Sequence, residues 1–243
     1  MDNILIKMEK EMISNSPKII PYKYILLISM LFVTIDLAAV SVAYKIVSLN
    51  YFLEINSAAT FIFPLTYAIG DIVTEVYGYN MARKLIWLSL FLQFIFAMLI
   101  TAAINLPSPT FWTFNDAYTT VFGSTLRFVL AGTIANIASN FMNVYIVSKL
   151  KIPMEGRLFW VRSILSTLIS GLLLTAIIVA VGFFGSEINV PKAGIMFKST
   201  YFCEIFYALA LVIPAALIAK FLKTSEKVDV YDYNTNFNPF RLA

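Results

Sequence analysis

Three long stretches of this chain contain no formally charged residue: Leu85–Asn115, Phe128–Ser148 and Ser163–Ser186. A helix needs roughly 20 apolar residues to cross the hydrocarbon core of a bilayer, and each stretch provides them. Across all 243 residues, 60% are hydrophobic and 13% are charged, whereas about a quarter of the residues of a soluble domain are charged. The sequence therefore predicts an integral membrane protein.

The predicted fold class is all-α: a polytopic membrane helix bundle of six transmembrane helices. We expect a transporter domain over residues 22–223, between a cytoplasmic N-terminal tail at 1–21 and a flexible, polar cytoplasmic C-terminal tail at 224–243. The six spans are expected at about Tyr22–Val47, Ser57–Tyr77, Leu85–Ile104, Leu126–Ser148, Leu158–Phe184 and Tyr201–Leu222.

The distribution of the 18 lysines and arginines predicts the orientation. Most of them lie in the two tails and in the connections around Arg83–Lys84 and Lys149–Arg157, whereas the alternate loops contain almost none. Because basic residues remain on the cytoplasmic side of a membrane protein, both termini are expected inside the cell.

Several kinds of chemistry are excluded by composition. The chain has no histidine, so histidine metal sites and histidine proton relays are absent. Its single cysteine, Cys203, rules out an intrachain disulfide. No phosphate-binding G-x-x-x-x-G-K-[ST] loop occurs, and no catalytic set is visible. We expect a protein that is not an enzyme and that holds no metal or prosthetic group.

Ionisable residues at membrane depth are the main functional signal, because each needs a partner or water. Asp36 lies near the middle of the first span, and Asp71 and Glu75 share a face of the second. Depth along the spans predicts two ionic layers. Glu75 would pair with Arg162 on the cytoplasmic side; on the outer side Glu204 would meet two cations, Arg127 and Lys45.

The fourth span adds a stripe of amides, Asn136, Asn140 and Asn143, at helical spacing. Such a stripe can read the edge of a planar heterocycle, or it can join neighbouring helices. Pro64 and Pro214 fall inside predicted spans, where a kinked helix can line a transport site or serve architecture alone.

Three functional hypotheses follow from the residues alone. The first is a small-solute transporter, which explains the short loops and the opposed polar faces. The second is an intramembrane aspartyl protease, although Ala68 stands where the G-x-G-D pattern around Asp71 requires glycine. The third is a substrate-binding membrane subunit energised by a partner ATPase module, docked on the small residues Ala39 and Ala43.

The stretch Phe61–Trp87, FIFPLTYAIGDIVTEVYGYNMARKLIW, is more specific. It resembles the queuosine precursor transporter family, also called the vitamin uptake transporter family, whose pattern here is close to F-P-x-x-[YF]-x-x-x-D-x-x-T-E-x-Y-G-x-x-x-A-R. The similarity covers roughly residues 25–222 and includes Arg127 and Arg162.

The resemblance implies a multi-pass importer in the bacterial inner membrane. Its cargo would be queuosine precursors, which are substituted deazaguanine bases used in tRNA modification. The implied partners are this nucleobase-like solute and the lipid bilayer, without direct contact to nucleic acid; a homo-oligomer or an energising partner stays open. The candidate substrate-binding residues are Asp71, Glu75, Tyr67, Phe63, Asn140, Asn143, Arg162, Asp36 and Glu204.

The chain departs from the pattern of the family in three spans. The family tends to carry Q-x-x-D in the fourth and fifth spans, where this chain has Asn140 with Asn143 and Gly171 with Leu174. It usually has a lysine at the position of Glu204. If these groups bind the base, the chain prefers a different precursor, such as queuine, or another solute; if they form a structural ion cluster, the changes compensate one another.

Overall fold

The computed structural model of the chain describes residues 22–49, 54–182 and 190–241. The expected N-terminal tail, 1–21, lies outside these residues. The elements in chain order are α2 (Ile25–Ser41), β1 (Ile46–Val47), β2 (Asn56–Ser57), the 3-10 helix η1 (Ala58–Phe61), α3 (Pro64–Tyr77), α4 (Tyr79–Ile104), α5 (Asn115–Phe122), α6 (Thr125–Lys151), α7 (Phe159–Ile177), the π-helical turn η2 (Ile178–Gly182) and α8 (Val190–Glu226).

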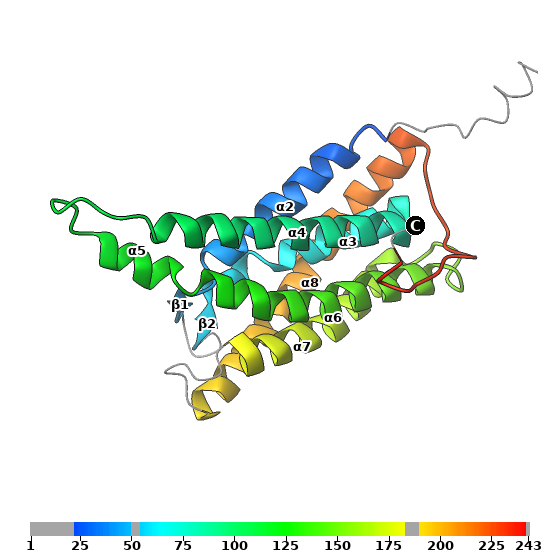
Figure 1. The fold of residues 1–243 in the computed structure, drawn as a ribbon. Coiled ribbons are helices and arrows are strands. Elements are labelled where there is room, and N and C mark those ends of the chain that lie inside the picture. The colour runs from blue at the N-terminus through cyan, green and yellow to red at the C-terminus, as the bar shows by residue number, and fades with distance from the viewer. Residues whose placement is uncertain (1–21, 50–53, 183–189, 242–243) are drawn as a thin grey trace, which may run out of the picture.

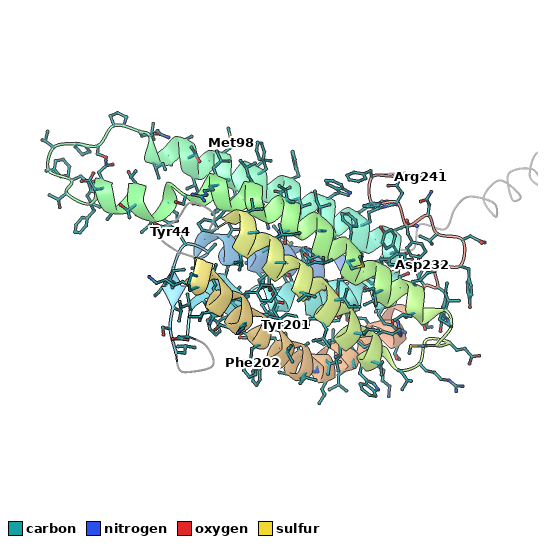
Figure 2. The ribbon with its side chains drawn as sticks, turned by 90° about the horizontal axis from the view of Figure 1, so that it is seen from below. Tyr44, Met98, Tyr201, Phe202, Asp232 and Arg241 are labelled. Atoms are coloured by element: carbon teal, nitrogen blue, oxygen red, sulfur yellow. The ribbon has the colours of Figure 1, made fainter. Side chains whose placement is uncertain are left out.

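The helices form a bundle with two distinct ends (Figure 1). Helices α4 and α6 run antiparallel and side by side, and α5 with its preceding loop projects at one end, which we call the hairpin end. The C-terminus lies at the opposite end, which we call the basic end. Figure 2 shows the same separation, with Asp232 and Arg241 at the basic end and Tyr44 toward the other.

The fold class is confirmed as all-α, with β1 and β2 forming only a two-residue antiparallel pair. By length and apolarity three described helices can cross a membrane: Tyr79–Ile104, Phe159–Val181 and Pro191–Glu226. A fourth candidate is the pair Asn115–Leu130 and Gly132–Lys151, bent by 46°. The two other elements are shorter, with 17 residues in α2 and 14 in α3.

The distribution of polar and apolar side chains between the interior and the surface is the reverse of that in a soluble protein. Large apolar residues cover the outer faces of the helices, including Leu26, Met30, Phe91, Leu99 and Leu209. Acidic, basic and amide side chains instead lie inside the bundle. A soluble domain of this size does not expose so much apolar surface, so the outer faces fit a lipid environment.

Three predicted boundaries need correction. Pro64 does not kink a span: it is the first residue of α3, where its missing N–H has no helical partner to lose. The first helix ends at Ser41 rather than near Val47, because the following residues pair with β2. Helix α8 begins at Val190, so part of the expected loop before Tyr201 is helical; Pro214 does lie inside it, as predicted.

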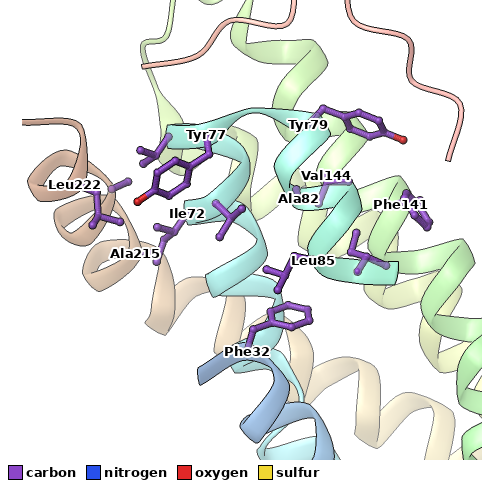
Figure 3. Packing of buried hydrophobic residues seen from close by; sticks show 14 of the residues in the cluster. Phe32, Ile72, Tyr77, Tyr79, Ala82, Leu85, Phe141, Val144, Ala215 and Leu222 are labelled. Atoms are coloured by element: carbon purple, nitrogen blue, oxygen red, sulfur yellow. The ribbon is translucent and has the colours of Figure 1, made fainter. Parts of the chain in front are cut away.

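The apolar core lies toward the basic end (Figure 3). Phe32 of α2 and Ile72 of α3 meet Leu85 of α4, while Phe141 of α6 and Leu222 of α8 complete the cluster. Lipid tails are as apolar as these side chains, so close van der Waals packing rather than removal from water holds the five helices together. The hairpin half of the bundle is packed less completely.

The C-terminal segment, residues 227–241, packs against the bundle, although the sequence predicts a flexible tail there. The Asp232 carboxylate accepts hydrogen bonds from the Tyr79 backbone N–H (2.9 Å) and the Ser148 hydroxyl (2.6 Å). Arg83 donates to the carbonyls of Asn236 and Asn238, and Trp87 Nε1 donates to the Pro239 carbonyl at 2.7 Å. Backbone acceptors give no compositional signal, which explains why the sequence does not predict this packing.

Replacing Asp232 by alanine should destabilise the basic end. The carboxylate caps the first N–H of α4, and loss of such a cap costs about 0.5–2 kcal/mol. We expect a lower unfolding temperature in detergent and faster proteolysis of the C-terminal segment. Asn234→Ala, a change at an exposed position two residues away, serves as the control and should leave both measurements unchanged. Equal behaviour of the two variants would contradict the capping role.

Candidate functional site

The buried polar residues form three groups along the bundle. A cluster of ions closes the basic end, Asp71 lies in a small polar group beside it, and a cavity occupies the hairpin half. These groups draw on different helices, so each is described separately.

Glu75 and Arg162 form the centre of the ion cluster. The Arg162 guanidinium, which is 0% exposed, donates from Nη1 to Glu75 Oε2 at 2.7 Å and to the Val147 carbonyl at 3.1 Å. Lys223 of α8 donates to the other carboxylate oxygen at 2.6 Å. The predicted pairing of Glu75 with Arg162 is therefore confirmed, and together with Lys223 it joins α3, α7 and α8.

Two further charges extend this cluster into the C-terminal segment. Asp229 accepts from Lys151 Nζ at 2.5 Å and from Lys223 Nζ at 2.9 Å. Partial burial by itself raises the pKa of the Asp229 carboxyl, but the hydrogen bonds from the two lysines outweigh it and hold the pKa below its usual value. Lys151 also donates to the backbone carbonyls of Glu75 and Val230. Each charged group of the cluster therefore has an oppositely charged partner within the protein.

Asp71 is held between α6 and α7. One carboxylate oxygen accepts from the Asn143 amide at 2.5 Å, and the other accepts from the Ser163 hydroxyl. Asn143 in turn accepts from Ser170 at 3.3 Å. Asp71 lines only a small space of about 10 Å³ between α3, α7 and α8, together with Tyr67 and Ser163. Its hydrogen-bonding capacity is largely used within the protein.

The hairpin half contains a second cavity, of about 110 Å³. The second half of α2, the start of α3, the middle of α4 and the hairpin-side parts of α6, α7 and α8 all contribute. Its polar lining residues are Asp36, Ser57, Thr60, Gln93, Asn136, Thr175, Thr200 and Glu204, and its apolar walls include Phe63, Phe128 and Leu174.

Several polar atoms at this cavity have no hydrogen-bond partner. Both amide atoms of Gln93 are buried and unpaired; the side chain lies next to Asp36 without hydrogen-bonding geometry. Asn136 Oδ1 and Glu204 Oε2 are unpaired as well, although Glu204 Oε1 accepts from Thr175 at 3.1 Å. The Tyr67 hydroxyl, nearby on α3, is also unpaired. Buried polar groups are nearly always satisfied, so unpaired ones around one cavity need a ligand or water.

The structure divides the predicted site residues into three sets: those that line the cavity, those that line the smaller space and those that line neither. Asp36, Phe63 and Glu204 line the cavity. Asp71 and Tyr67 line the smaller space. Pro64 lines both the smaller space and the cavity. Among the rest, Asn143 supports Asp71, Glu75 and Arg162 form the ion cluster, and Asn140 is buried in α6 without lining either space.

The predicted outer ionic layer does not form around Glu204. Its carboxylate is bonded to Thr175 rather than to a cation, and Arg127 and Lys45 are exposed near the hairpin end. Both cations lie near helix ends, where long basic side chains reach toward the membrane surface. Depth along the spans thus predicts the inner pair correctly and the outer one incorrectly.

The two amide residues that line the cavity, Gln93 and Asn136, are not among the predicted site residues. Gln93 lies in the middle of a predicted span with no charged residue, and its lone amide at that depth was the available signal. Asn136 belongs to the predicted amide stripe, but it alone of the three asparagines lines the cavity. The position of the cavity along α6 decides this, and periodicity does not reveal it.

Comparison with known proteins identifies the family of the chain. A family model described as "Putative vitamin uptake transporter" matches residues 57–219, more than half of the chain. The chain belongs to this family. It is also 30% identical over 155 residues to a protein of Bacillus subtilis (strain 168) named "Probable queuosine precursor transporter". That alignment covers 62% of this chain and 65% of the relative, so the chain spans less than two thirds of it.

No solved structure matches the chain. Family membership and the apolar outer helix faces make the chain a multi-pass membrane protein. The family description and the name of the relative both denote transporters. The intramembrane protease hypothesis is set aside with this assignment, and neither comparison supports a partner ATPase.

Proposed function

We propose that the protein is an inner-membrane importer of queuosine precursors, binding a substituted deazaguanine base in the cavity of the hairpin half. The observation that carries this proposal is the group of unpaired amide and carboxylate atoms around a cavity with aromatic walls. A planar base with a lactam edge would satisfy these atoms, and Phe63 and Phe128 offer faces against which it packs. The named relative supports the substrate class.

The proposed topology has six crossings, made by α2, η1 with α3, α4, α6, α7 and α8, and both termini in the cytoplasm. Lysines and arginines at the basic end favour this orientation. The cavity then lies in the outer half, and the ion cluster closes the inner half. Import would require the contacts at the basic end to open, as alternating access demands.

The test is restoration of queuosine in tRNA. The chain is expressed in a bacterial strain that neither makes nor imports the precursors but retains the enzymes that incorporate them. With a deazaguanine precursor supplied at low concentration, we expect queuosine to reappear in digested tRNA by mass spectrometry. A strain that expresses an unrelated membrane protein is the control. No queuosine from any precursor, with the chain inserted in the membrane, would overturn the proposal.

A further inference from the structure

The cavity differs from an ordinary base-binding pocket in the charge of its lining. Asp36 and Glu204 both contribute carboxyl groups, and no lysine or arginine occurs among the described residues that line it. Asp36 accepts a hydrogen bond from Ser89 of α4, whereas Glu204 Oε2 is unpaired. An anionic solute would meet carboxyl groups without any compensating cation, which is unfavourable in a low-dielectric interior.

The unpaired atoms define what a ligand must offer. Glu204 Oε2 and Asn136 Oδ1 are acceptors, and the Gln93 amide offers two N–H donors and one acceptor. The three side chains are only 4%, 5% and 1% exposed, so bulk water does not replace the ligand at these atoms. A matching ligand carries several N–H donors and at least one carbonyl oxygen.

Local packing fixes the Glu204 carboxylate beside the cavity. Thr175 on α7 donates to Oε1, one turn after Gly171. A Cβ atom at position 171 would overlap Glu204 Oε2 and lie 3.1 Å from the Glu204 carboxyl carbon. The absence of a side chain at Gly171 therefore lets this carboxylate pack against the backbone of α7 at the wall of the cavity.

We infer that the cavity selects solutes with a protonated amine or several N–H donors over neutral analogues and carboxylates, and that Glu204 is the residue that makes this selection. Gln93 and Asn136 bind the amide edge that all the candidate bases share. The inference rests on the proposed function and adds the preferred substituent: an aminomethyl group is favoured over a cyano group at the same ring position. A carboxylate-bearing vitamin is excluded.

The experiment measures binding to the purified full-length chain in detergent. The probes are the aminomethyl deazaguanine, the cyano deazaguanine, queuine and a carboxylate-bearing vitamin, with affinity obtained from thermal stabilisation. A hydrogen bond to a charged group is worth about 10- to 100-fold in affinity. We expect the wild-type chain to prefer the aminomethyl over the cyano compound by a ratio in this range.

Glu204→Gln keeps the size of the side chain and its contact with Thr175, so it should fold normally. We expect this variant to lose the preference, because its affinity for the aminomethyl compound should fall while its affinity for the cyano compound changes little. Gln93→Met should lower the affinity for both bases by a similar factor and leave the ratio of the two affinities unchanged. Asp116→Asn, which removes an equal charge from an exposed position on α5, is the matched control and should behave as wild type.

The outcomes separate the two proposals. In one outcome the wild-type chain binds a deazaguanine, and Glu204→Gln shows the same preference for the aminomethyl compound. That result would overturn the role of Glu204 and leave the proposed function standing. Wild-type preference for the cyano compound or for the carboxylate vitamin would overturn the predicted selectivity. No binding of any deazaguanine by a folded sample would overturn the proposed function and this inference together.

Discussion

Replacement of Arg162 by alanine should cost the protein about 3–5 kcal/mol of unfolding free energy, because it leaves part of a buried ion pair without its partner. The guanidinium is inaccessible and engages Glu75 and the Val147 carbonyl from one nitrogen. Lys223 remains beside Glu75, but it approaches the other carboxylate oxygen and does not fill the space left between α3 and α7. Unfolding in detergent, followed by circular dichroism, measures the loss.

Arg157→Ala provides the control for this prediction. Its side chain is 81% exposed and approaches Glu155 only at 4.0 Å. Surface changes of this kind usually stay within about 0.5 kcal/mol. If Arg162→Ala were as stable as Arg157→Ala, the ion cluster would not hold the helices together, and Glu75 and Arg162 would return as candidates for substrate binding.

Replacement of Asp71 by asparagine should reduce uptake by at least about tenfold, equivalent to about 1.4 kcal/mol. The change preserves shape, and Ser163 can reorient its hydroxyl toward an amide, so we expect normal amounts of folded protein in the membrane. It removes the charge of the carboxylate that joins α3 to α6 and α7. We expect the proposed transport to need relative movement of these helices.

Binding distinguishes this role from direct recognition of the substrate. Asp71 lines the smaller space and is absent from the described lining of the cavity. The affinity of Asp71→Asn for a deazaguanine should therefore change by less than about threefold, as expected for a residue that does not line the cavity. Asp116→Asn again controls for charge. Unchanged uptake would remove Asp71 from the mechanism, and a large loss of affinity would place it in the binding site.

The candidate site was predicted in part from the sequence. Carboxylates at membrane depth pointed correctly to Asp36, Asp71, Glu75 and Glu204 as buried, because desolvation makes such residues rare without a purpose. Their division of labour was not predictable. A buried carboxylate can pair with a cation, accept a hydrogen bond from an amide or face a cavity, depending on how its helix is rotated about its axis. The sequence of a uniformly apolar span gives little information about that rotation.

The sequence by itself determined that this protein lies in a lipid bilayer, that its fold is helical and that Glu75 pairs with Arg162. These results follow from apolar length, charge and spacing, which are properties of single segments. Tertiary structure decided the rest. It placed the cavity in the hairpin half, brought Gln93, Asn136 and Glu204 around it, and secured the C-terminal segment with Arg83 and Asp232. These contacts join residues far apart in the chain, often through backbone carbonyls that every residue has, so only the packed bundle specifies them.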